Sequence, residues 1–99
     1  MSDPVKLEIE FHDNGQRGLY ATEYEGHRAK MTFVHEADGV IAADHTYVPP
    51  EIEGHGVAAA LVSHAIEDAR AKGWKIRPAC SYVEAAFKKH PEWADVLAD

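Results

Sequence analysis

Hydrophobic and polar residues alternate near the start of the chain. The apolar positions of the run 5–12 are Val5, Leu7, Ile9 and Phe11, and every residue between them is polar. A period of two predicts a strand with one buried face. The Asn14–Gly15 pair that follows is a strong hairpin signal, so this strand is expected to pair antiparallel with a second strand over 19–24.

Two further stretches extend the predicted sheet. Residues 28–36 carry Met31 and Phe33 on alternate positions, and the turn signal at 37–39 leads into a fourth strand over 40–48. Pro49 and Pro50 then remove two backbone donors, which ends any ladder. The first half of the chain is therefore predicted to be a meander of four antiparallel strands.

The hydrophobic period changes after Gly56. Residues three or four apart become apolar, namely Val57, Leu61, Ala65, Ile66 and Ala69. This pattern predicts an amphipathic helix over 56–72 that closes at Gly73. An irregular strand is expected over 74–81, and the helical crossover predicts that it lies parallel to the fourth strand.

The C-terminal part is predicted to be helical. A short helix over 83–89 is expected to stop at His90–Pro91, and a last helical turn over 92–97 packs through Trp93. Together with the sheet, these segments predict an α+β chain.

Composition narrows the functional classes. With 99 residues, of which 45% are hydrophobic, the chain is expected to form one domain over 1–99. The formal charge of -7 argues against a nucleic-acid partner. Cys80 is the only cysteine, and no apolar run reaches membrane-spanning length. We therefore expect a cytoplasmic protein with no membrane partner, either a monomer or a weak dimer.

Metal binding is not expected. None of the seven histidines stands in a His-Glu-x-x-His pattern, and one cysteine cannot anchor a structural zinc site. The densest basic cluster is Lys88-Lys89-His90, which is either part of an anion site or a solvated helix face.

The glycine loop before the long helix is the first candidate binding site. Gly54 and Gly56 permit positive φ angles, and the first turn of the helix has backbone N–H groups without earlier carbonyls to pair with. Such a turn binds anions without lysine or arginine. The loop fits neither the P-loop nor the dinucleotide fingerprint. Without further information, an ordinary strand-to-helix turn is the competing interpretation.

Two motifs carry a family resemblance. The segment from His45 to Ala58 reads His-Thr-x-Val-Pro-x-Glu-x-x-Gly-x-Gly-Val-Ala, and it resembles the pyrophosphate-binding motif of the GNAT acetyltransferase superfamily. The later Pro-x-Cys-x-Tyr-Val from Pro78, together with His90-Pro91-Glu92, is similar to the small single-domain GNAT-like N-acetyltransferases of about a hundred residues. The resemblance covers nearly the whole chain.

The resemblance implies a fold, an activity and a set of site residues. The implied fold is a GNAT-like mixed sheet with the central helix after the glycine loop, and the implied activity is acetyl-CoA-dependent N-acetyltransfer to a small-molecule or peptide amine. Cys80 and His45 are the implied catalytic residues. The implied acetyl-CoA-binding residues are Thr46, Tyr47, Val48, Gly54, His55, Gly56, Val57, Ala58, Ala59, Tyr82, Phe87 and Lys88.

One position departs from the family pattern. The superfamily usually has Arg or Gln three residues before the glycine equivalent to Gly56, whereas this chain has Glu53. A carboxylate there repels a diphosphate, and Glu51 adds to the same effect. We therefore expect CoA binding that is weakened rather than lost.

Several mechanistic alternatives stay open at this stage. Cys80 is either a nucleophile that accepts the acetyl group or a small side chain lining the site, in which case the amine attacks directly while His45 or water takes its proton. No Lys or Arg is adjacent to Cys80, so only His45 or a helix N-terminus near Val83 could lower the pKa of the thiol. The competing functional class is a non-catalytic CoA-binding, acyl-CoA-binding or protein-interaction module.

Overall fold

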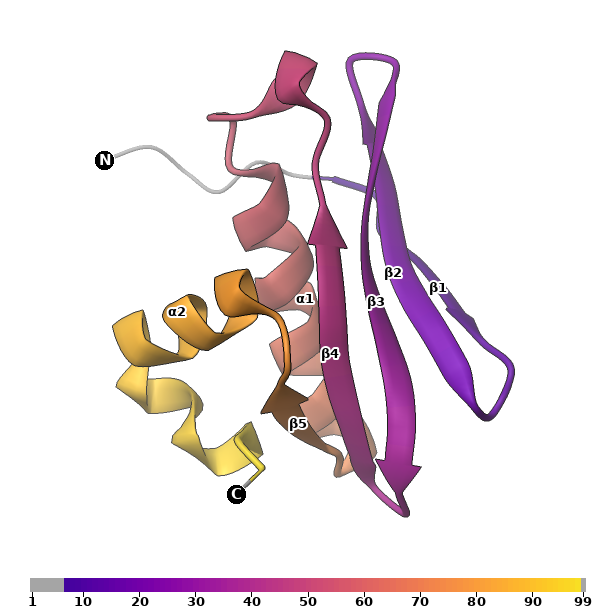
Figure 1. Cartoon of the computed structure of the whole chain (residues 1–99), viewed down its shortest axis with the longest axis vertical. Coiled ribbons are helices and arrows are strands. Elements are labelled where there is room, and N and C mark those ends of the chain that lie inside the picture. The colour runs from indigo at the N-terminus through magenta and orange to yellow at the C-terminus, as the bar shows by residue number, and fades with distance from the viewer. Residues whose placement is uncertain (1–6, 99) are drawn as a thin grey trace.

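The computed structural model describes residues 7–98, which form one five-stranded sheet and two α-helices (Figure 1). The elements are β1 (Glu10–Asp13), β2 (Arg17–Tyr24), β3 (His27–Ala37), β4 (Val40–Tyr47), the 3-10 helix η1 (Pro50–Ile52), α1 (Val57–Lys72), β5 (Lys75–Pro78), α2 (Ser81–Lys89) and the 3-10 helix η2 (Pro91–Val96). The strands lie in the order β1-β2-β3-β4-β5. The first four pair antiparallel, and β5 pairs parallel with β4. The predicted α+β architecture is confirmed.

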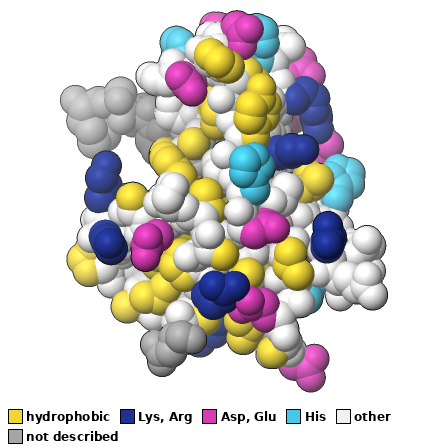
Figure 2. All heavy atoms as spheres, in the orientation of Figure 1, with side chains coloured by type: hydrophobic (Ala, Val, Ile, Leu, Met, Phe, Trp, Pro, Cys, Tyr) yellow, Lys and Arg dark blue, Asp and Glu magenta, His cyan; other side chains and the backbone are white. Residues whose placement is uncertain are grey.

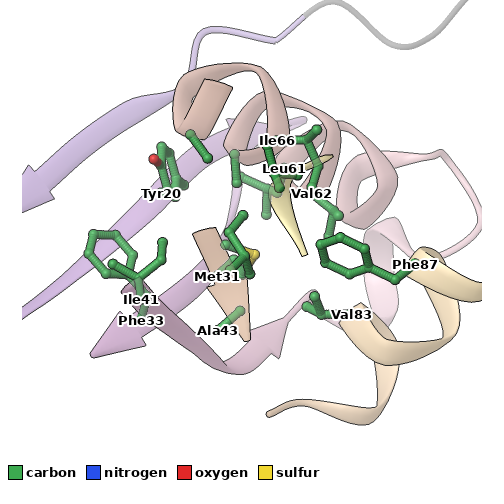
Figure 3. Packing of buried hydrophobic residues seen from close by; sticks show 14 of the residues in the cluster. Tyr20, Met31, Phe33, Ile41, Ala43, Leu61, Val62, Ile66, Val83 and Phe87 are labelled. Carbon is green, nitrogen blue, oxygen red and sulfur yellow. The ribbon is translucent and has the colours of Figure 1, made fainter. Parts of the chain in front are cut away.

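The long helix α1 begins and ends at glycines. Gly56 caps its N-terminus with φ 79°, and Gly73 caps its C-terminus with φ 75°. Both values lie in the left-handed region that favours glycine. The apolar stripe of α1 packs on the sheet, and Figure 3 shows Leu61 and Ile66 among the core side chains that include Met31.

The two faces of the sheet differ. Ala29, Met31 and Phe33 of β3 are buried and belong to the same core cluster as α1. Because side chains alternate along a strand, Lys30 and Thr32 lie on the opposite face. The helices gather on one side of the sheet (Figure 1), and we call the face that bears Lys30 and Thr32 the open face.

A glycine in β2 keeps the core closed at one end of the sheet. A Cβ atom at Gly18 would lie 2.3 Å from Cζ of Phe33 and 2.5 Å from the carbonyl oxygen of His12. Real Cβ atoms do not approach so closely, so a side chain at this position is excluded by packing. Phe33 therefore fills the space over β2.

The first predicted strand is largely wrong in its bounds. β1 spans only Glu10–Asp13, and residues 5 and 6 lie outside the described residues. Leu7 and Ile9 pack against the core without joining the ladder. The hydroxyl of Thr22 donates to the carbonyl of Glu8 at 2.8 Å, so a side chain replaces a ladder bond beside β2.

The predicted strand over 74–81 is also too long. β5 ends at Pro78, and Cys80 is the N-cap residue of α2 with φ −108° and ψ 137°. The N–H of Ala79 makes the last bond to β4, to the carbonyl of Ala43, and the chain then turns into α2. Cys80 is therefore placed by the start of a helix and not by a strand. The short helix η1 over Pro50–Ile52 was not predicted.

Within residues 7–98, no helix has both the length and the apolar character needed to cross a membrane.

Candidate functional site

The candidate site lies where β4 and β5 separate. Their pairing stops at Ala43 opposite Pro78, and the N–H of Ala79 donates to the carbonyl of Ala43 at 3.0 Å. Beyond this point β4 continues beside the start of α1, and a cleft of about 630 Å³ opens there. We call it the α1 cleft. It is lined by Thr46, Tyr47, Val48, Pro50, Ile52, Glu53, Gly54, Gly56, Val57, Ala58, Ala59 and Tyr82.

One end of the α1 cleft is the first turn of α1. Ala60 is the first residue whose N–H is bonded within the helix, to the carbonyl of Gly56 at 3.0 Å. The N–H groups of Val57, Ala58 and Ala59 precede it and have no intrahelical acceptor. No side chain caps this end, and no acid lies in the first turn. These amides and the positive end of the helix dipole together make this end of α1 suited to binding an anion.

The loop before α1 brings negative charge to the same place. Glu53 is exposed and lines the α1 cleft, whereas the neighbouring Ile52 is buried and fixes η1 to the core. Figure 2 shows acidic side chains at the loop above the exposed hydrophobic side chains near the end of β4. A bound anion would therefore meet favourable backbone dipoles and an opposing carboxylate.

Cys80 is not one of the residues that line the α1 cleft, but it contacts Thr46, which is. The Cys80 Sγ–H donates to Oγ1 of Thr46 at 3.6 Å, and the side chain is half-buried. Burial raises the pKa of the Cys80 thiol. Hydrogen bonds to the thiolate from the Val83 N–H, from the Thr46 hydroxyl, which becomes the donor once the thiol has lost its proton, and from the Tyr82 N–H outweigh burial and lower the pKa below its ordinary value. Since α2 begins at Ser81, its dipole favours a thiolate at this position.

His45 does not share this environment. It pairs opposite Thr32 on β3, whereas Thr46 pairs opposite the buried Met31. Consecutive residues of a strand point to opposite faces, so His45 lies on the open face and Thr46 faces the helices. From the sequence, either His45 or a helix N-terminus could lower the pKa of the Cys80 thiol. The groups that lower it are the start of α2 and Thr46, and His45 is not one of them.

Most of the implied CoA-binding residues are brought together in the α1 cleft, but three are not. His55 packs its ring against Tyr24, with 5.4 Å between centroids. Phe87 is only 8% exposed and packs edge-on against Trp93. Lys88 is exposed on α2. Phe87 follows the apolar Val83 by four residues, so the two lie on the same face of a helix. This spacing was the sequence signal that Phe87 belongs to the core and not to the cleft.

Three lining residues were not proposed as binding residues from the sequence. Pro50 and Ile52 belong to η1, and Glu53 was considered only as a departure from the family pattern. The Pro49–Pro50 pair was the sequence signal that could have identified these lining residues. Because the prolines prevent β4 from continuing in the sheet, the chain after them must turn toward the start of α1.

Comparisons with known proteins agree with the fold. A family model described as "GCN5-related N-acetyl-transferase" matches residues 19–96. A solution NMR structure of a GCN5-like candidate N-acetyltransferase from Staphylococcus aureus is similar, with 26% sequence identity and a TM-score of 0.67. The similarity covers 90% of this chain and 87% of that one. No curated protein matches the sequence.

Proposed function

The chain belongs to the GCN5-related N-acetyltransferase family, and from this premise we propose that it transfers an acetyl group from acetyl-CoA to an amine by way of Cys80. The observation that carries the proposal is the layout of the α1 cleft. Three unpaired amides of the first turn of α1 lie in its lining, and Cys80 contacts Thr46, another of its lining residues.

The residues present fit the acyl donor. A diphosphate needs backbone donors, which the first turn of α1 supplies. A pantetheine arm needs strand-edge amides and an apolar wall. In the described residues, β4 has no β5 partner beyond Ala43, so the edge near Thr46 and Val48 is available, while Ile52 and Tyr82 line the walls.

The donor site is tested by giving α1 an acid in its first turn. Ala59 is exposed and lines the α1 cleft. In Ala59→Glu, the carboxylate complements the helix dipole and stabilises the free protein by roughly 0.3–1 kcal/mol. The same charge occupies the anion site, so we expect CoA to lose most of its effect on the melting temperature.

The matched control is Ala71→Glu in the last turn of α1, where Ala71 is exposed and far from the cleft. It should slightly destabilise the free protein, because an acid opposes the dipole there, and CoA should stabilise it as much as the wild type. Equal CoA stabilisation of Ala59→Glu and wild type would show that the first turn of α1 is not the diphosphate site.

The chemical step uses the Cys80 thiolate. Its Sγ attacks the thioester carbonyl carbon, so that an Sγ–C bond forms while the C–S bond to CoA breaks and the CoA thiolate takes a proton. A neutral amine then attacks the acetyl carbon on Cys80, a C–N bond forms, and the C–Sγ bond breaks to restore the thiolate. The amine nitrogen gives its extra proton to water or to His45.

The covalent route predicts a labelled protein. Incubation with acetyl-CoA and no amine should add one acetyl group at Cys80, seen by peptide mass spectrometry, and release one equivalent of CoA thiol. Cys80→Ser should accumulate no such thioester and should lose most turnover of an amine panel. An unlabelled thiol, with Cys80→Ala turning over at the wild-type rate, would refute this route and favour direct attack by the amine.

A further inference from the structure

A second cleft lies on the open face of the sheet, on the other side of β4 from the donor cleft. It has a volume of about 750 Å³. The side chains that matter for its chemistry are His12, Arg17, Leu19, Thr32, Val34 and Asp44, all of which line it. We call it the open-face cleft. Leu19 and Val34 give it an apolar floor, and Arg17 and Asp44 give it opposite charges.

Asp44 stands out of the ladder at a β-bulge. Phe33 pairs with Ala43 and Thr32 pairs with His45, so Asp44 is the extra residue between two registers. The hydroxyl of Thr32 donates to Oδ1 of Asp44 at 2.6 Å and fixes the carboxylate on the open face. Among residues 7–98 no cation lies within ion-pair distance of Asp44. Its charge is thus available to a ligand.

The bulge lies at the point where the sheet splits. The bond from Ala79 to Ala43 closes the β4–β5 ladder on one side of Asp44, and the contact between Cys80 and Thr46 begins on the other. Residues two apart in a strand are separated by about 7 Å. An amine held by Asp44 therefore needs to pass only the edge of β4 to reach an acyl carbon at Cys80.

Arg17 supplies the opposite pole of the cleft. It pairs with Val34 on β3, and Val34 pairs with Ala42, two residues before Asp44. From the spacing of strands and residues, the Cα atoms of Arg17 and Asp44 lie about 12 Å apart. In the described part of the chain Arg17 makes no ion pair, whereas Asp13, the other acid in the lining, accepts from Nε2 of His35 at 2.9 Å.

From these observations we infer that the open-face cleft is the acceptor site and that its ligand is a zwitterion with an aliphatic body, an amino acid or a similar molecule. The ammonium pairs with Asp44, the carboxylate pairs with the Arg17 guanidinium, and the carbon chain lies over Leu19 and Val34. This inference rests on the proposed function. The bound ammonium loses one proton to water before its nitrogen attacks the acyl carbon on Cys80. As the C–N bond forms, the C–Sγ bond breaks to restore the thiolate, and the nitrogen loses its second proton to water or to His45, which releases the amide.

The test uses three probes of one length: 6-aminohexanoate, hexylamine, which lacks the carboxylate, and hexanoate, which lacks the amine. Binding is followed without acyl donor by the NMR shifts of the Thr32 and Val34 amides. Turnover is followed separately as CoA thiol release. We expect 6-aminohexanoate to bind at least about tenfold more tightly than either one-ended probe, since each loses one charge-assisted contact.

Two variants and two controls locate the poles. Arg17→Gln should make 6-aminohexanoate and hexylamine equal, and Asp44→Asn should abolish the binding of both. Lys30→Gln removes a cation from the same face outside this cleft, and Asp38→Asn removes an exposed acid from the turn after β3. Both controls should bind like the wild type, and the NMR spectra report at once whether each variant is folded.

The outcomes separate this inference from the proposed function. Binding of 6-aminohexanoate at Thr32 and Val34 without acyl transfer would support the cleft and count against the proposed transfer. Acyl transfer with no shift at these amides, or with an Asp44→Asn variant as active as Asp38→Asn, would overturn the acceptor site. Equal binding of hexylamine and 6-aminohexanoate to the wild type would overturn the carboxylate pole.

Discussion

Replacing Thr46 with valine removes the hydroxyl beside the Cys80 sulfur and keeps the shape of the side chain. The contact from Sγ to Oγ1 is 3.6 Å, long for a hydrogen bond to a charged group, which is ordinarily worth about 1.5–3 kcal/mol. For a half-buried thiolate with such a contact we take about 1 kcal/mol, which is roughly a fivefold change in the ionisation equilibrium. The pKa of the Cys80 thiol should therefore rise.

The measurable effect is the rate of alkylation by iodoacetamide, because the thiolate reacts and Cys80 is the only thiol. Below the pKa, the rate in Thr46→Val should fall about fivefold, following the ionisation estimate. Above the pKa, where the thiol is fully ionised, the rate should match the wild type.

Two controls isolate the hydroxyl. Thr46→Ser keeps the donor and should retain the wild-type profile. Thr32→Val makes the same substitution on the open face, where the hydroxyl serves Asp44, and should leave the thiol unchanged. If Thr46→Val had the same pH–rate profile as wild type, the stabilisation of the thiolate would have to come from the start of α2 alone.

Two further predictions concern affinity and pH. Glu53→Gln should tighten CoA binding by about two- to fivefold at low salt, because a carboxylate in the cleft lining is removed. Titration calorimetry measures this, with Glu51→Gln as the control because Glu51 is exposed outside that lining. Equal CoA affinities of the Glu53→Gln and Glu51→Gln variants would contradict the prediction. Burial raises the pKa of Asp68, but hydrogen bonds from Lys72 and Tyr20 outweigh it and the pKa is lowered. Its stabilisation is therefore complete above the unfolded-state pKa of about 4 and lost as pH falls through the folded-state pKa. Tyr20→Phe, which deletes a 2.6 Å hydrogen bond to Asp68, should cost about 1–3 kcal/mol in urea unfolding at neutral pH and less in acid; an equal loss at both would contradict this.

Local patterns predicted the elements whose causes are local. The helix over 56–72 was expected from its apolar spacing and flanking glycines, and α1 spans Val57–Lys72. The parallel pairing of β5 with β4 followed from the crossover through α1. The lining of the α1 cleft by Gly54 and Gly56 follows from the same loop, although their contact with a bound donor stays a prediction.

What the sequence did not reveal depends on contacts between distant segments. The early end of β5 at Pro78 is set by where α2 packs, and this moved Cys80 from a strand to a helix start. The burial of Phe87 against Trp93 depends on η2 folding back over α2. A cluster of side chains such as that of the open-face cleft comes from four strands, and no single window of sequence contains it.

The bulge at Asp44 is the clearest case, because it changes which face each later residue of β4 occupies. Ala43 is buried on the helix side, so strict alternation would place His45 on that side and Thr46 on the open face. The register shift between Phe33 and Thr32 inserts one extra residue and reverses this order. Thr46 therefore meets Cys80, while Asp44 and His45 are left on the open face. A single inserted residue thus separates the side chains that hold the thiolate from those available to an amine. Deleting Asp44 should restore a regular ladder with the same partners, which keeps Thr46 beside Cys80 and His45 on the open face and removes only the carboxylate; loss of the wild-type Cys80 alkylation profile in that variant would contradict this account of the bulge.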